Sequence, residues 1–130
     1  MALSKPNFFI IGAPKCGTTS LHNYLNRHSQ ITMSHPKEPH YFSRDIENGG
    51  IRDQKKYENC FSHSDRNAVA VGESSTLYLY SKVAVQNICN YNRDAKFITM
   101  IRNPIEIARS FHQVALKVFG EIETDFQKAW

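Results

Sequence analysis

The segment Gly12–Ser20 constrains this chain's fold more than any other, because it joins a buried apolar run to a helix. Residues Asn7–Ile11 before it form a short, largely apolar run, typical of a strand buried on both faces in a parallel sheet. After it, Leu21, Tyr24 and Leu25 recur at helical spacing. A strand, a glycine-containing loop and a helix in this order favour anion binding, because the helix N-terminus presents N–H groups and a favourable dipole.

The alternation of strands and helices continues along the chain. Strands are predicted at Ile31–Met33, at Val69–Val71, stopped by Gly72, and at Lys96–Ile101; helices are predicted at Gln54–Phe61, at Val83–Tyr91 and from Pro104 to Phe119, stopped by Gly120. The polar segment Ser43–Gly50 is expected to be exposed. A chain of 130 residues suffices for one domain and not for two. Residues 1–130 are therefore predicted to form a single α/β domain with a mainly parallel sheet and flanking helices.

The last residues of the chain predict one more helix. Thr124–Gln127 has a capping-box pattern, and Trp130 ends the chain soon after it. A helix this short is marginal unless something packs on it. We therefore expect the chain to be the N-terminal part of a longer fold, with exposed apolar surface that favours a homo-oligomer.

Composition narrows the classes of function. A net charge of +4 is compatible with an anionic ligand but too small to indicate nucleic acid. The longest apolar run, Phe8–Ile11, is far too short for a membrane span, and no secretory signal is visible at the N-terminus. Three isolated cysteines suit a reducing compartment. We expect a cytoplasmic protein with no nucleic-acid partner and no membrane span.

The chemistry of Gly12–Ser20 fits a phosphate group. Gly17 lets the backbone approach a ligand closely, and Lys15 adds a point charge. The hydroxyls of Thr18, Thr19 and Ser20 add further donors at the helix N-terminus. The simpler alternative is an ordinary helix cap beside a surface lysine.

The spacing of Gly12 and Gly17 imitates a nucleotide-binding P-loop, but the lysine is misplaced. Thr18 stands where the P-loop lysine would be, and Lys15 precedes the second glycine instead. No strand ends in an obvious Mg²⁺-binding aspartate, and no recognised metal-ligand spacing is present. The loop predicts a P-loop-like nucleotide-binding core without a metal, and it disfavours a nucleotide kinase.

A second candidate segment, Pro36–Phe42, follows the second predicted strand. Ligands of open α/β sheets bind outside the carboxyl ends of strands, so Glu38 is a candidate general base there. His40 is a rival, since histidine titrates nearer to neutral pH than glutamate does. The alternative is a solvated pair of Lys37 and Glu38 in a loop.

A third candidate lies where the Lys96–Ile101 strand ends. The guanidinium of Arg102 matches a phosphate bidentately, and Ser110 follows in the next helix. Together they predict a second phosphate site. The alternative is a strand-end arginine paired with Glu106, beside a helix-surface serine.

The segments together resemble one family. Pro14–Leu21 resembles the 5′-phosphosulfate loop of sulfotransferases that use 3′-phosphoadenosine 5′-phosphosulfate (PAPS), and Arg102–Glu106 with Ser110 resembles their 3′-phosphate motif. Lys37–Phe42 is similar to the segment that carries the catalytic glutamate in heparan-sulfate-type and related bacterial members. Gly72–Leu79 is similar to a family segment near the acceptor.

The resemblance implies a role for each matching residue. Glu38 would take the proton from a hydroxyl or amine of a small-molecule or carbohydrate acceptor. Lys15 and Lys37 would assist the transfer electrostatically, and PAPS would be the co-substrate. The residues implied to bind PAPS are Lys15, Cys16, Gly17, Thr18, Thr19, Ser20, Arg102 and Ser110.

The sequence departs from the family pattern within Gly72–Leu79. Thr76 stands where the family usually has proline, and Ser74 where heparan-type members often have lysine. Two other functions stay open beside sulfuryl transfer. One is a non-catalytic nucleotide-binding module, and the other is a P-loop nucleotide kinase.

Overall fold

The structure, a computed structural model, describes residues 5–47, 49–64 and 67–129. It divides into two compact units, Met1–Met100 and Ile101–Trp130, and each is described by itself. The single domain expected over residues 1–130 stays a prediction. Its first four residues and Trp130, where the predicted last helix ends, lie outside the described part of the chain.

The first unit is built on a parallel sheet. Its four strands are β1 (Phe8–Gly12), β2 (Ile31–Met33), β3 (Ala70–Ser74) and β4 (Lys96–Thr99), in the order β2-β3-β1-β4. Every neighbouring pair is parallel, so the predicted α/β class and parallel sheet are confirmed. All five residues of β1 are buried, as the continuous apolar run indicates for a central strand.

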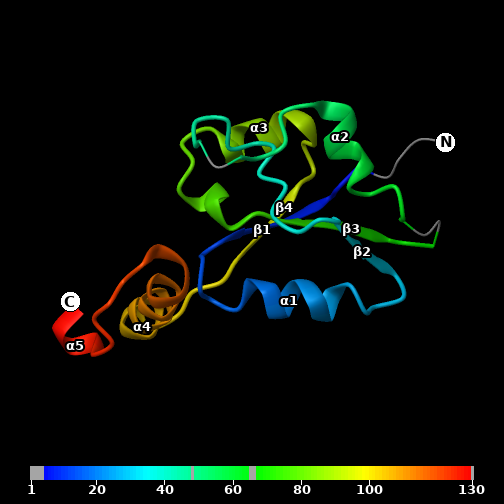
Figure 1. Cartoon of the computed structure of the whole chain (residues 1–130). Helices are drawn as coiled ribbons and strands as arrows, with labels where there is room; N and C mark the ends of the chain where they lie inside the picture. Colours follow the sequence, from blue (N-terminus) through cyan, green and yellow to red (C-terminus); the bar gives the residue numbers. More distant parts are fainter. Residues whose placement is uncertain (1–4, 48, 65–66, 130) are drawn as a thin grey trace. The chain divides into compact units, whose positions relative to one another are not determined.

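Helices cover both faces of this sheet, as Figure 1 shows. They are α1 (Thr18–Leu25) on one face, α2 (Gln54–Asn59) and α3 (Ala84–Tyr91) on the other, and the short 3₁₀ helix η1 (Thr76–Leu79) after β3. Alternate side chains of β1 feed the two cores: Phe8 packs toward α1 with Leu25, and Phe9 packs with Tyr57 and Ile88 of α2 and α3. The helices predicted after Gly17, at Gln54–Phe61 and at Val83–Tyr91 are confirmed, the second ending at Asn59, but η1 was not anticipated.

Gly72 does not end its strand, which corrects the prediction. β3 continues through Gly72 to Ser74, with Glu73 paired to Phe9 of β1. A Cβ atom at residue 72 would lie 2.1 Å from the ring of Phe8, so glycine is needed because that ring lies against the backbone. The longer strand carries Glu73 and Ser74 to the carboxyl edge of the sheet.

The segment after Phe42 is less exposed than its polarity indicates. Arg44 and Asp45 are exposed as predicted. Ser43, however, is fully buried, and its hydroxyl donates to the carbonyl of His40 at 3.3 Å. This bond ties the beginning of the segment to the candidate site.

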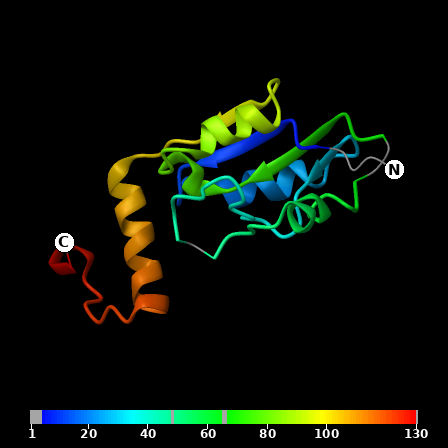
Figure 2. The same cartoon turned by 90° about the horizontal axis from the view of Figure 1, so that it is seen from above.

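The second unit is helical. It consists of α4 (Pro104–Val114), its π-helical continuation η2 (Ala115–Phe119) and the short α5 (Phe126–Ala129). Figure 2 shows the predicted helix from Pro104 to Phe119 as one continuous coil, drawn in orange. The last helix is capped by Asp125, whose carboxylate accepts from the N–H of Gln127 at 2.9 Å, and not by Thr124. Across the described ranges, no helix has the length and hydropathy that crossing a membrane requires.

Candidate active site

Polar segments gather at the edge of the sheet where the strands end. The N–H of Ala13, just after β1, donates to the carbonyl of Met100, just after β4, at 2.9 Å. The N–H of Ser75, just after β3, donates to the carbonyl of Ile10 at 3.1 Å. The segment after β2 joins them, since the N–H of Glu38 donates to the carbonyl of Ser74 at 3.0 Å. Open α/β sheets bind ligands at this edge.

The loop after β1 has the backbone expected of an anion-binding turn. Gly17 has φ 83° and caps the N-terminus of α1, and Lys15 has φ 63°, also in the left-handed region. Thr18 is buried, whereas Thr19 and Ser20 are exposed at the first turn of the helix. The first turn of a helix leaves its N–H groups without intrahelical partners. These atoms are the ones that the sequence assigns to the 5′-phosphate, an assignment that stays a prediction.

Two residues of this loop differ in how their side chains are placed. Cys16 is only 6% exposed, so its thiol packs inside the protein and leaves the backbone as its means of contacting a ligand. Lys15 is half-buried.

Gly12 lies so close to η1 that a Cβ atom there would be 2.9 Å from the carbonyl oxygen of Thr76. The loop after β1 therefore abuts η1.

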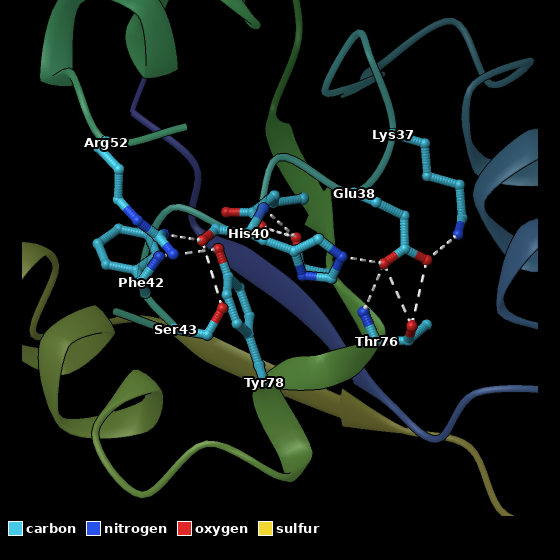
Figure 3. A network of polar contacts seen from close by, with 10 residues as sticks. Lys37, Glu38, His40, Phe42, Ser43, Arg52, Thr76 and Tyr78 are labelled. Carbon is cyan, nitrogen blue, oxygen red and sulfur yellow. Dashed lines mark hydrogen bonds and ion pairs between the residues drawn. The ribbon is translucent and has the colours of Figure 1, made fainter. Parts of the chain in front are cut away.

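The carboxylate of Glu38 is surrounded by hydrogen-bond donors, as Figure 3 shows. Lys37 Nζ lies 2.5 Å from Oε1, and His40 Nε2 lies 2.8 Å from Oε2. Thr76 donates its N–H to Oε2 at 3.1 Å and directs its hydroxyl at both oxygens at 3.2 Å. The two candidate bases, Glu38 and His40, thus contact each other and belong to one site.

These contacts determine the charge of Glu38. Partial burial by itself would raise the pKa of the carboxyl. Hydrogen bonds from His40 and Lys37, the positive charge of Lys37 and the N–H of Thr76 outweigh burial and lower the pKa to about 2. Glu38 is therefore a carboxylate at neutral pH, which is the form that accepts a proton.

The backbone around Glu38 is conformationally unusual. Glu38 has φ 62° and His40 has φ 50°, although neither is glycine. Such left-handed residues cost about 1–3 kcal/mol each and persist where neighbours hold them, which is common at active sites. Here the N–H of His40 donates to the hydroxyl of Ser75 at 3.0 Å, and Arg52 donates to the carbonyl of His40 at 3.0 Å.

A buried carboxyl that the sequence analysis did not assign lies behind this segment. Glu73 is fully buried, and it accepts hydrogen bonds from Tyr57 and Ser75, each at 2.6 Å. Burial raises its pKa, and the hydrogen bonds from Ser75, Tyr57 and Tyr78 oppose that rise only in part. The sequence feature that indicates Glu73 is the polar run that directly follows the apolar residues of β3.

The two residues assigned to the 3′-phosphate lie in the second unit. Arg102 follows β4 and pairs with Glu106 at 3.0 Å, and Arg109 lies 3.6 Å from the same carboxylate. Ser110 is half-buried on α4. Their joint action with the loop after β1 stays a prediction. As for metals, the described ranges contain no group of three or more His, Cys, Asp and Glu side chains placed to hold an ion.

Comparison with known proteins identifies relatives over most of the chain. Residues 6–83 match the profile of the sulfotransferase family. The membrane-associated sulfotransferase kil1 of Dictyostelium discoideum is 31% identical over 115 residues, 88% of this chain and 24% of that protein. The human bifunctional heparan sulfate N-deacetylase/N-sulfotransferase 2 is 31% identical over 114 residues, 83% of this chain and 13% of that protein.

A crystal structure supports the same relationship. The sulfotransferase from Alicyclobacillus acidocaldarius superposes with a TM-score of 0.85 and 36% identity, covering 96% of this chain and 55% of that one. The chain therefore spans about half the length of this structural relative and a quarter or less of the two curated relatives.

Proposed function

Because this chain belongs to the sulfotransferase family, we propose that it forms the donor-binding part of an enzyme that transfers a sulfuryl group from PAPS to an acceptor hydroxyl or amine. One observation carries the proposal. The carboxylate of Glu38 and the loop Gly12–Ser20 lie at the same edge of the sheet: Thr76 donates to the carboxylate, and Gly12 lies so close to Thr76 that no side chain would fit between them. A proton acceptor thus stands next to a loop suited to phosphate.

Each group has a defined task in this proposal. Lys15 and the first-turn N–H groups of α1 bind the 5′-phosphate of PAPS. Glu38 removes the proton from the acceptor, whose oxygen or nitrogen forms a bond to sulfur as the bond between sulfur and the 5′-phosphate oxygen breaks. Adenosine 3′,5′-bisphosphate leaves, and Lys37 balances the charge that develops.

The contacts of Glu38 suit a base whose proton affinity rises when the acceptor binds. With a pKa of about 2 the carboxylate is ionised but has little affinity for a proton. Lys37 and His40 hold that pKa low. An acceptor that displaces either bond raises the proton affinity of Glu38 as the reaction begins.

The acceptor and the cellular setting are further proposals. We propose a carbohydrate hydroxyl or amine as the acceptor, since one relative is named for heparan sulfate. A cytoplasmic location rests on the free cysteines Cys16, Cys60 and Cys89. A homo-oligomer rests on exposed apolar side chains such as Val69 and Tyr80.

Calorimetry with adenosine 3′,5′-bisphosphate and AMP tests the proposal. The bisphosphate should bind at least about tenfold more tightly, because a charge-assisted hydrogen bond contributes about 1.5–3 kcal/mol. Arg102→Ala should remove most of this preference. Arg109→Ala is the matched control, since Arg109 contacts the same Glu106 but is not among the residues assigned to the phosphate.

Two results would contradict the proposal. Equal affinity for AMP and the bisphosphate would remove the second phosphate site. Mg²⁺-dependent turnover of ATP would support a P-loop kinase instead.

A further inference from the structure

Thr76 contributes both of its polar groups to one carboxylate. Its N–H donates to Glu38 Oε2 at 3.1 Å, and its hydroxyl lies 3.2 Å from each carboxylate oxygen. Thr76 is the first residue of η1, a position whose N–H has no partner within the helix. The residue is only 7% exposed, so water does not compete freely for these bonds. The bonds therefore fix how the carboxylate is turned.

The residues before Thr76 hold the backbone of the same segment. The carbonyl of Ser74 accepts from the N–H of Glu38, and the hydroxyl of Ser75 accepts from the N–H of His40. Ser75 is itself fixed, because it is fully buried and donates to Glu73 at 2.6 Å. Three consecutive residues thus hold the backbone at Glu38 and His40 and the carboxylate of Glu38.

We propose that Thr76 is a positioning residue for Glu38, holding the carboxylate in the orientation in which it meets the acceptor. This inference rests on the proposed role of Glu38 as the base. Glu38 and His40 have left-handed φ angles, which persist where neighbouring groups hold the residues in place. Thr76 is one such neighbour, because it binds the carboxylate of Glu38.

The other groups around Glu38 are ionisable. Lys37 and His40 come from its own segment, and His22 of α1 interacts with it electrostatically. Thr76, from η1, has no ionisable group. Its N–H and hydroxyl therefore do not change charge with pH, unlike the donors of Lys37 and His40.

Nuclear magnetic resonance of the 130-residue chain, with carbon-13 in the glutamate carboxyls, measures the effect directly. In the unaltered chain the Glu38 carboxyl has a pKa of about 2. Thr76→Val keeps the shape and the N–H but removes the hydroxyl, and it should raise that pKa by about one, a tenfold change in the acid dissociation constant. Thr76→Pro removes both donors and should raise it further. Thr76→Ser keeps both donors and should restore the original value.

The proline variant is expected to fold. Proline is tolerated at the first position of a helix, where its missing N–H has no helical partner. Ser75 before it has φ −133° and ψ 99°, the extended conformation that a residue before proline prefers. Thr76→Val gives an independent measurement that leaves the backbone unaltered.

Activity supplies a second reading that separates this inference from the proposed function. Thr76→Val should lower kcat for sulfuryl transfer about tenfold and leave the KM for PAPS unchanged, with recovery in Thr76→Ser. The same Glu38 pKa in all four proteins overturns the positioning role. If Glu38→Gln transfers sulfuryl groups at the original rate, the proposed base is wrong, whatever the titration shows.

Discussion

Glu38 and Glu73 lie at the two ends of one chain of hydrogen bonds, but their surroundings differ. The side chain of Glu38 is 30% exposed, whereas Glu73 is fully buried in β3. Ser75 donates to Glu73 and accepts from the N–H of His40, and the imidazole Nε2 of His40 contacts Glu38. The pKa of Glu38 is lowered to about 2, and that of Glu73 is raised.

The partners of the two carboxyls explain the difference. Glu38 is bound by cationic or imidazole nitrogen atoms of Lys37 and His40, which favour the charged form. Glu73 is bound by the neutral hydroxyls of Tyr57 and Ser75, which do not compensate for the loss of water. Of the two, only Glu38 is both ionised and accessible. We therefore assign the role of general base to Glu38 and a structural role to Glu73.

The largest expected effect is on catalysis at Glu38. In a catalytically competent protein, Glu38→Gln should lower kcat at least about a hundredfold, because a positioned base contributes about 10²–10⁴ in rate. Affinity for adenosine 3′,5′-bisphosphate should barely change, since the base meets the acceptor. Steady-state kinetics and calorimetry measure the two quantities separately.

His40→Asn is the comparison that sharpens this assignment. Lys37 and Thr76 still hold the carboxylate in that variant, so we expect a smaller loss of about tenfold, the value of one charge-assisted hydrogen bond. A larger loss for His40→Asn than for Glu38→Gln would make His40 the base. Weakened binding of the bisphosphate in Glu38→Gln would instead place this segment in the nucleotide site.

The next effect is on stability at Glu73. Glu73→Ala leaves the buried hydroxyls of Tyr57 and Ser75 without their acceptor and should lower the free energy of unfolding by about 2–4 kcal/mol. Glu73→Gln keeps the shape and one oxygen acceptor and should cost less. Denaturant titration measures both, with Glu47→Ala on the exposed surface as the control. An unchanged stability in Glu73→Ala would show that Glu73 is not a support.

The smallest expected effect is on the pH dependence of stability. It is also the one that most directly distinguishes Glu38 from Glu73. Folding makes Glu38 a stronger acid than its ordinary value of 4.5, so its contribution is present above pH 4.5 and is lost as the pH falls toward about 2. Folding makes Glu73 a weaker acid, so its contribution is present below pH 4.5 and is lost as the pH rises through its raised pKa.

Chemical unfolding across this pH range distinguishes the two carboxyls. Glu38→Gln should flatten the gain in stability between about pH 2 and 4.5, and Glu73→Gln should flatten the loss above pH 4.5. If both substitutions removed the pH dependence of stability in the same pH range, folding would shift the pKa values of the two carboxyls in the same direction. The proposed difference between Glu38 and Glu73 would then be wrong.

The sequence by itself determined the elements and the order of the motifs. The apolar run before Gly12, the proline at the start of α4 and the glycine after η2 are local signals, each contained within a few residues. Such signals depend on backbone sterics and on the spacing of apolar side chains, which do not require a partner elsewhere in the chain. The α/β class and most element positions followed from them.

Only the tertiary structure decided what surrounds Glu38. Thr76 and Ser75 meet Glu38 and His40 across 38 and 35 residues of chain, through the pairing of β2 with β3. That pairing depends on strand register, which is fixed only when the strands bury their apolar faces against elements elsewhere in the chain, and a shift of one residue would turn Glu73 to the other face. Gly72 shows the same limit: the local sequence predicts a strand end there, but the strand continues, and glycine is needed because the ring of Phe8 on the neighbouring strand lies against it.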